Sequence, residues 1–152
     1  MITADTNIFV YNVDGDDPAK QDASTEILDA LAARSAPMVL QVAGEFYSAL
    51  ARQLRRPPWQ CAQAARNLLT SFRIIAATRR STERALAEAA TGRLSFWDAN
   101  LLSAAEAGGC THIISEDMSD GLKLGNLEVV HPFAGDKLSA RALALLYGGT
   151  DA

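Results

Sequence analysis

The segment MITADTNIFVY, residues 1–11, indicates how the fold begins. Its apolar residues Ile2 to Ala4 predict a short first strand, and Asn7 to Val13 then predict a short helix. Asp5 stands between the two, so a carboxylate follows directly on the first strand. The same arrangement returns late in the chain, where the apolar run Thr111 to Ser115 predicts another strand that is followed by acidic residues. The chain therefore has two predicted strands, one early and one late, that each lead directly into acidic residues.

Between these junctions, short apolar runs alternate with segments of helical periodicity. Further strands are predicted at residues 37–41, 74–76 and 127–130. Helices are predicted at residues 19–34, 42–55, 59–71 and 140–147, and two more start at Ser81 and Ser95 and stop at Gly92 and Gly108-Gly109. This alternation predicts an α/β fold with a mostly parallel central sheet. The length of 152 residues fits a single domain over residues 1–152.

The first and fourth strands both lead into carboxylates. In a parallel α/β sheet the site lies beyond the carboxyl ends of the strands, so Asp5 and Asp117 are expected at the same rim. Asp5 is equally a favoured N-cap for the following helix. Residues 115–121 carry three acids within five positions, Glu116, Asp117 and Asp120. A solvated turn tolerates their mutual repulsion, and a bound divalent cation would relieve it.

Two more acids fall on predicted helices. Glu45 lies mid-helix among apolar neighbours, where a lone glutamate is commonly solvated. Gly44 beside it is costly inside a helix, so close approach of another backbone or room for a ligand would explain it. Asp98 opens an apolar helix after Ser95, where a capping role competes with a functional one, and Asn100 is placed to add a polar contact. As a set, Asp5, Glu45, Asp98 and Asp117 are the carboxylates that metal-assisted phosphodiester hydrolysis needs.

The net charge of −4 is unevenly distributed. The segment from Arg52 to Arg93 holds nine arginines and two acids and is +7, whereas the remainder is −11. All nine cations are arginines, which grip phosphate in a bidentate way, so we interpret the segment as a surface for a polyanion. Solvated helix faces are the alternative. Trp59 and Trp97 are interpreted as core or interface residues, with stacking on unpaired bases as the alternative.

Other classes of protein are disfavoured by composition. The longest run without a charged residue, Ser35 to Gly44, is ten residues long. A membrane-spanning helix needs roughly 20 apolar residues, so none is expected. The N-terminus has no basic region before its apolar residues and is not typical of a signal peptide. Cys61 and Cys110 make neither a disulfide framework nor a metal spacing, and the cytoplasm is the expected compartment.

These residues resemble the PIN-domain family, and within it the VapC-like toxins of bacterial type II toxin–antitoxin pairs. The resemblance rests on Asp5-Thr6-Asn7, Glu45, Asp98 within SFWDA (95–99) and Ser115-Glu116-Asp117, and it extends from Ile2 to about Phe133. It implies a three-layer α/β/α domain whose parallel sheet has the strand order 3-2-1-4-5. It also implies cleavage of RNA with Mg²⁺ or Mn²⁺, by a homodimer that a cognate antitoxin protein neutralises.

The resemblance also implies roles for individual residues. Asp5, Glu45, Asp98 and Asp117 would be the catalytic metal ligands. Asp120 or Glu116 could share or take the role of Asp117 as the fourth ligand. Asn7 and Ser115 would be polar supports of the site. We expect flanking phosphates to be bound by arginines of the basic segment, namely Arg52, Arg55, Arg56, Arg79 and Arg80.

Two other functions compete with this one. A phosphatase of the haloacid-dehalogenase type also places an aspartate after its first strand, but it needs a second carboxylate two residues later, where this chain has Asn7. A catalytically weak PIN-like module that binds RNA or protein would keep the fold without the cleavage.

Overall fold

The computed structural model describes residues 1–148, so the last four residues of the predicted domain lie outside the described part. Strands and helices alternate through the first two thirds of the chain, as predicted. The elements are β1 (Ile2–Ala4), α1 (Thr6–Val13), α2 (Pro18–Ala33), β2 (Pro37–Val39), α3 (Leu40–Arg52), α4 (Pro58–Ser71), β3 (Arg73–Ile75), α5 (Arg79–Ala90), α6 (Phe96–Ala107), β4 (His112–Ile114), β5 (Lys123–Leu124), β6 (Leu127–Val130), β7 (Phe133–Ala134), β8 (Lys137–Leu138) and α7 (Ala140–Tyr147).

The centre of the fold is a mostly parallel sheet, as predicted. β1 pairs with β4 in parallel, β4 pairs with β6 in parallel, and the short β5 adds an antiparallel edge. β2 and β3 form a second parallel pair. β2 is tied to β1 by the Thr3 hydroxyl, which donates to the carbonyl of Pro37 at 2.8 Å.

These pairings agree with the predicted strand order except between β2 and β1, where no pairing of the described strands tests it. The order 3-2-1-4-5 corresponds to β3-β2-β1-β4-β6, and both the β3-β2 and the β1-β4-β6 parts are present. Within residues 1–148, no backbone ladder joins β2 to β1. The continuous order therefore stays a prediction across that junction.

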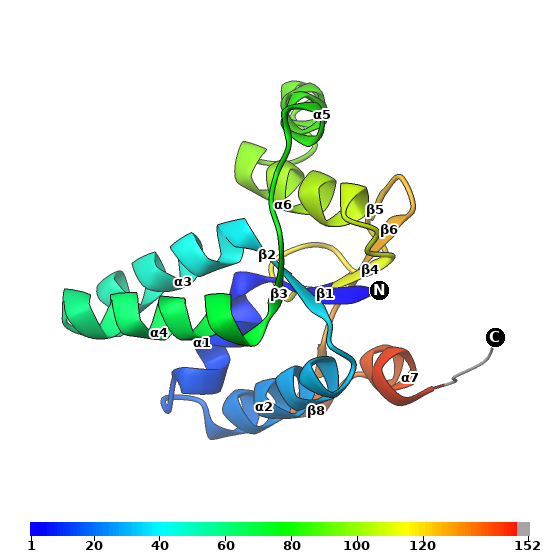
Figure 1. The fold of residues 1–152 in the computed structure, drawn as a ribbon. Helices are drawn as coiled ribbons and strands as arrows, with labels where there is room; N and C mark the ends of the chain where they lie inside the picture. Colours follow the sequence, from blue (N-terminus) through cyan, green and yellow to red (C-terminus); the bar gives the residue numbers. More distant parts are fainter. Residues whose placement is uncertain (149–152) are drawn as a thin grey trace.

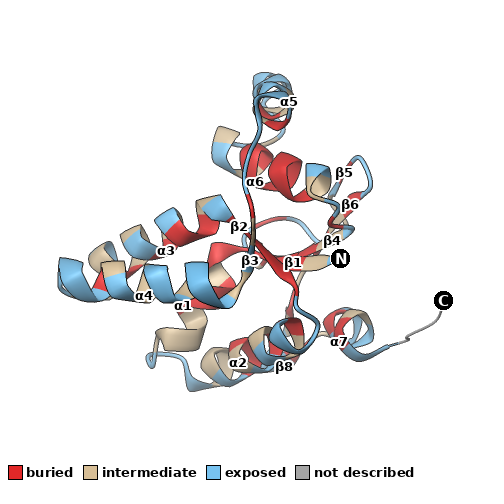
Figure 2. Ribbon diagram, viewed as in Figure 1, coloured by how far each residue is buried: buried red, intermediate tan, exposed pale blue. Residues whose placement is uncertain are grey.

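Helices cover both faces of the sheet. α2 and α7 lie on one side of it and α5 and α6 on the other, while α3 and α4 project together from one end (Figure 1). Buried residues gather on the strands and on the inner faces of these helices (Figure 2). The largest side chains that are completely buried are aliphatic and come from both layers and the sheet, among them Ile8, Ile27, Met38, Leu101, Leu102, Ile113 and Leu127. This arrangement is the α/β architecture expected from the alternation of elements.

Two predicted boundaries are wrong in an instructive way. The strand predicted at residues 37–41 ends at Val39, and α3 already begins at Leu40. A strand buried on both faces needs buried side chains, and Leu40 is 46% exposed. The helix predicted from Ser81 begins at Arg79, because the Thr78 hydroxyl accepts from the Ser81 amide and the Ser81 hydroxyl accepts from the Thr78 amide. Serine at this position completes a capping box in place of the expected Glu or Gln.

The helices give no sign of a membrane span. Over residues 1–148, none is both long and apolar enough to cross a bilayer.

The terminal helix α7 has the predicted bounds, Ala140–Tyr147.

Candidate active site

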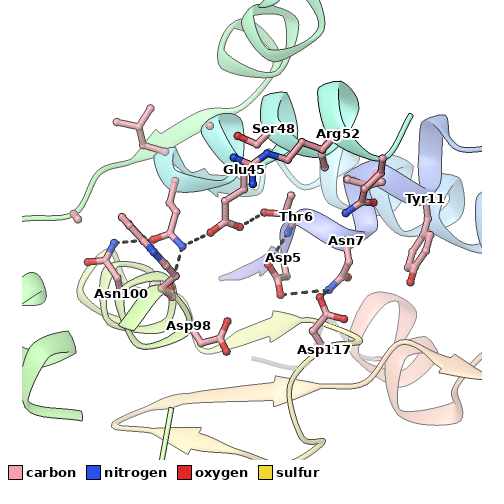
Figure 3. Close-up of a pocket in the computed structure, with 18 of the residues that line it drawn as sticks. Asp5, Thr6, Asn7, Tyr11, Glu45, Ser48, Arg52, Asp98, Asn100 and Asp117 are labelled. Atoms are coloured by element: carbon pink, nitrogen blue, oxygen red, sulfur yellow. Dashed lines mark hydrogen bonds between the residues drawn. The ribbon is translucent and has the colours of Figure 1, made fainter. Parts of the chain in front are cut away.

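The chain segments that follow the first four strands meet at one pocket of about 900 Å³ (Figure 3). Asp5 follows β1, Gln41 follows β2, Ala77 follows β3 and Asp117 follows β4, and all four line the pocket. The parallel strands end at the same rim, which is why residues so distant in sequence meet there. Each of the four predicted acids lines this pocket: Asp5, Glu45, Asp98 and Asp117.

Asp5 is the most buried of these acids, at 6% exposed. Its Oδ1 accepts from the amide of Thr6 at 2.6 Å, so it does act as the N-cap of α1. Its Oδ2 accepts from the Ser115 hydroxyl at 2.7 Å, across the register that pairs β1 with β4. The capping role and the pocket role therefore coexist in one side chain.

Asn7 joins the first acid to the last. Its amide nitrogen lies 3.3 Å from Oδ2 of Asp5 and 3.1 Å from Oδ2 of Asp117 (Figure 3). The Oδ1 atom of Asn7 is buried and has no hydrogen-bond partner among the described residues. Asn7 and Ser115 thus contact the acids that they were predicted to support.

Glu45 is held by two residues to which the sequence analysis assigned no role, Thr6 and Gln41. The Thr6 hydroxyl donates to its Oε2 at 2.6 Å, and the Gln41 amide donates to its Oε1 at 2.6 Å. Asn100 donates in turn to Gln41 at 2.7 Å. Gln41 lies four residues before Glu45 on the same helix, a spacing that brings side chains together. The misplaced start of α3 concealed this pair, because residue 41 was predicted as strand.

Gly44 lines the same pocket, and of the two explanations for it the structure supports room for a ligand. A Cβ atom added there would meet nothing within 4 Å, so no neighbouring backbone requires a glycine. Glycine in a helix interior costs about 0.5–1 kcal/mol relative to alanine. The open space therefore lies on the pocket side of α3.

Asp98 has its carboxylate free for another role. The cap of α6 is Ser95, whose hydroxyl accepts from the backbone amide of Asp98 at 3.1 Å. No side-chain hydrogen bond to the Asp98 carboxylate is found within residues 1–148, where it points into the pocket (Figure 3). The N-terminus of the helix also favours an anion at this position.

The acids make the pocket electrostatically unfavourable for one another. Burial raises the pKa of Asp5 from 3.8 to about 6, although the Ser115 hydroxyl and the Thr6 amide oppose that rise, and the charges of Glu45 and Asp117 add to it. A proton or a cation at this point would relieve the repulsion.

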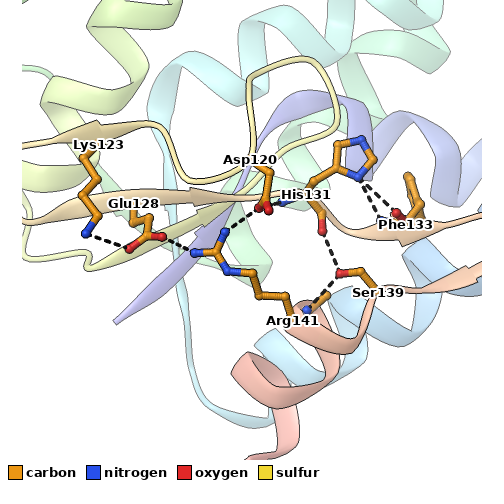
Figure 4. A network of polar contacts seen from close by, with 8 residues as sticks. Asp120, Lys123, Glu128, His131, Phe133, Ser139 and Arg141 are labelled. Atoms are coloured by element: carbon orange, nitrogen blue, oxygen red, sulfur yellow. Dashed lines mark hydrogen bonds and ion pairs between the residues drawn. The ribbon is translucent and has the colours of Figure 1, made fainter.

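The two alternatives for the fourth acid are occupied elsewhere. Glu116 pairs with Lys20 at 2.6 Å and accepts from the Tyr11 hydroxyl. Burial opposes ionisation of Glu116, but these hydrogen bonds hold its pKa below the usual range. Asp120 accepts from the backbone amide of His131 at 2.9 Å and from Arg141 at 2.7 Å (Figure 4). Neither residue lines the pocket, whereas Asp117 does.

The carboxylate oxygens of the pocket suit a hard divalent cation, although they are not gathered around one point. Oxygen ligands from carboxylates are what Mg²⁺ and Mn²⁺ prefer. Within residues 1–148, no three His, Cys, Asp or Glu side chains lie so that they could hold a metal ion between them as they stand. The buried and unpartnered Oδ1 of Asn7 and the raised pKa of Asp5 nevertheless fit a place where a cation would be stabilised. Asp5, Asp98, Glu45 and Asp117 would hold such an ion.

Of the five arginines expected to bind phosphate, one lines the pocket. Arg52 lies at the end of α3 that is far from Leu40, with its side chain beside Ser48 (Figure 3). Arg56 instead donates to the carbonyl of Val13 at 3.0 Å. Arg79 pairs with Glu83, and Arg55 and Arg80 are exposed away from the pocket lining.

Known proteins of the same fold include the following two. A toxin–antitoxin complex from Klebsiella pneumoniae matches with a TM-score of 0.64 and 20% identity, over 88% of this chain and 98% of the other. VapBC2 from Rickettsia felis, bound to a DNA fragment from its promoter, matches with a TM-score of 0.63 and 19% identity, over 85% and 97%. At these identities the likeness concerns the fold. A comparison with curated protein sequences gives no significant match.

The family model of the PIN domain matches residues 2–119, which include all four acids of the pocket. That span is more than three quarters of the 152 residues. The resemblance first drawn from the acidic residues is thereby confirmed: the chain belongs to the PIN-domain family.

Proposed function

We propose that this protein is an endoribonuclease that depends on Mg²⁺ or Mn²⁺ and acts as the toxin of a toxin–antitoxin pair. PIN domains are generally nucleases. The observation that carries the proposal is the meeting of Asp5, Glu45, Asp98 and Asp117 at one pocket. A neighbour of the same fold that is described as a toxin–antitoxin complex supports an antitoxin partner. We expect a homodimer in the cytoplasm.

The mechanism that we propose is in-line attack of water on an RNA phosphodiester. Asp5, Glu45, Asp98 and Asp117 would hold a divalent ion, which would supply a water of lowered pKa and stabilise charge on the phosphate. Ser115 and the amide of Thr6 fix both oxygens of Asp5, while Gln41 and Thr6 fix those of Glu45. Arg52, along the same pocket, binds a flanking phosphate.

The test is cleavage of labelled RNA by the purified protein with Mg²⁺ or Mn²⁺, compared with the same reaction in EDTA. We expect metal-dependent internal cleavage. Retention of RNA without cleavage under any divalent metal would contradict the proposal and favour the PIN-like binding module. A phosphorylated Asp5 would favour the haloacid-dehalogenase alternative, which the PIN family assignment already speaks against.

The fourth acid gives a prediction of its own. We expect Asp117→Asn to lower kcat/KM by about 100-fold or more, because it removes a pocket carboxylate. Asp120→Asn keeps an acceptor for the His131 amide and loses only a surface ion pair, so its activity should stay within a few-fold of wild type. Glu116→Gln keeps the contact with Tyr11 and should also cost only a few-fold. Initial rates under identical metal conditions would rank the three variants, and a larger loss in Glu116→Gln than in Asp117→Asn would reverse the assignment.

Arg52 gives a prediction about salt. If Arg52 neutralises a phosphate, Arg52→Gln should weaken RNA binding and reduce the slope of log K against log salt by about 0.7, the value for one contact on a single strand. Arg66 is likewise an exposed arginine of the basic segment but does not line the pocket, so Arg66→Gln is the matched control. Equal slopes for wild type and Arg52→Gln in a salt titration would exclude this contact.

A further inference from the structure

The pocket is elongated along the whole of α3. The side of α3 that lines it carries Leu40, Gly44, Ser48 and Arg52, each four residues after the last. Positions four apart lie on one face of a helix, and twelve residues of helix span about 18 Å. The groove, which is the part of the pocket along α3, thus begins at Leu40 beside the polar Gln41 and ends at the cationic Arg52. Glu45, one residue from Gly44, lies between these ends.

An exposed tryptophan lies at the Leu40 end of this groove. Trp97 lines the pocket next to Asp98 and is 62% exposed, so it is not a core residue, whereas its interpretation as an interface residue stays a prediction. Its backbone carbonyl accepts from the Gln41 amide at 2.9 Å, and its ring packs edge-on against Phe96 with the centroids 5.0 Å apart. The residue is therefore held in place while much of the indole faces solvent beside the acids.

We propose that Trp97 is the platform on which an unpaired base of the RNA stacks, next to the phosphate that is cleaved. The proposal rests on the ribonuclease function proposed above. The groove offers an aromatic face, then carboxylates that can hold a cation, then Arg52, and this order matches a base followed by successive phosphates. A paired base has both faces covered by its neighbours, so only an unpaired base can present its face to the indole. Gly44 leaves space between the platform and Arg52.

Trp59 provides a matched control. It is 71% exposed, lies on α4 and does not line the pocket. Base–aromatic stacking is worth about 1–3 kcal/mol, which corresponds to about 5- to 150-fold in affinity. We therefore expect Trp97→Ala to raise KM for single-stranded RNA by about 5- to 150-fold with a smaller change in kcat. Trp97→Phe should recover most of that loss, and Trp59→Ala should behave as wild type.

The decisive experiment removes a base from the RNA, whereas the variants above remove the indole from the protein. A series of single-stranded oligoribonucleotides, each with one abasic nucleotide at a different position, is cleaved by wild type and by Trp97→Ala in Mn²⁺. At one position the abasic substitution should raise the wild-type KM to the value of the variant and add nothing to the variant. Circular dichroism and thermal unfolding verify that the variants are folded.

The outcomes separate this inference from the function on which it rests. If wild type cleaves no RNA, the proposed function fails. If wild type cleaves RNA but Trp97→Ala has the same KM, stacking is overturned while the nuclease function stands. The same holds if Trp97→Ala raises KM equally on every abasic substrate. If stacking is overturned in this way, Trp97 serves the structure or a protein partner.

Discussion

Asp98→Asn is expected to reduce RNA cleavage by about 1,000-fold or more while the protein stays folded. Ser95 caps α6 through the backbone amide of residue 98, and asparagine keeps that amide and the size of the side chain. What the substitution removes is a negatively charged ligand oxygen in the pocket. Metal stabilisation of the transition state is worth several kcal/mol, and each 1.36 kcal/mol is about tenfold in rate. The loss should therefore appear in kcat/KM and not in stability.

The measurement is the initial rate of RNA cleavage in saturating Mn²⁺, with the far-ultraviolet circular dichroism spectrum as the check on folding. Asp22→Asn is the matched control, because Asp22 is an exposed acid on α2, outside the pocket that holds the four acids. It should cleave as wild type does. Undiminished cleavage by both Asp98→Asn and Asp5→Asn would eliminate the proposed site.

The second large effect concerns stability. Asp5→Asn is expected to raise the free energy of unfolding of the metal-free protein by about 2 kcal/mol at pH 7.5. Burial raises the pKa of Asp5 to about 6, against 3.8 for the ordinary side chain. The folded state therefore binds this proton more tightly than the unfolded state does. The stability that this proton contributes is complete below pH 3.8 and is lost as the pH rises through about 6.

A difference of this size between the two pKa values corresponds to nearly 3 kcal/mol at most. Asparagine carries no charge, and its Oδ1 still accepts from the Thr6 amide. Its new amide group faces the amide of Asn7, a mismatch that reduces the gain. The net expectation is a variant that is more stable and inactive, because the same buried charge serves the chemistry and strains the fold.

Urea unfolding in EDTA at pH 4 and pH 7.5 measures this effect. The advantage of Asp5→Asn should be present at pH 7.5 and nearly vanish at pH 4, where wild-type Asp5 is largely protonated in the folded protein. Adding Mn²⁺ at 100 times its Kd should stabilise wild type by about 2.7 kcal/mol and the variant much less. If the two proteins have equal stability in EDTA at both pH values, the buried charge of Asp5 does not oppose folding.

Much of the fold could be predicted from local patterns. The strand Ile2–Ala4 and the helix Ala140–Tyr147 have the predicted bounds. The short strands β5, β7 and β8 were not predicted, because two-residue strands carry no periodicity and arise from turns whose partners lie close by. The start of α3 was misplaced because an apolar residue at a strand end and an apolar residue in the first turn of a helix look alike in sequence.

Local patterns in the sequence identified the candidate residues for the chemistry. The order of strands and helices places acids at carboxyl ends of strands, and the types of side chain indicate an oxygen-ligand site, since both are local properties of the chain. How those residues are arranged follows from the tertiary structure. It brought Thr6 onto Glu45, paired Glu116 with Lys20, and left Asp117 facing the pocket. Such choices depend on contacts between segments as many as 110 residues apart, whose distances follow from packing and not from neighbouring residues.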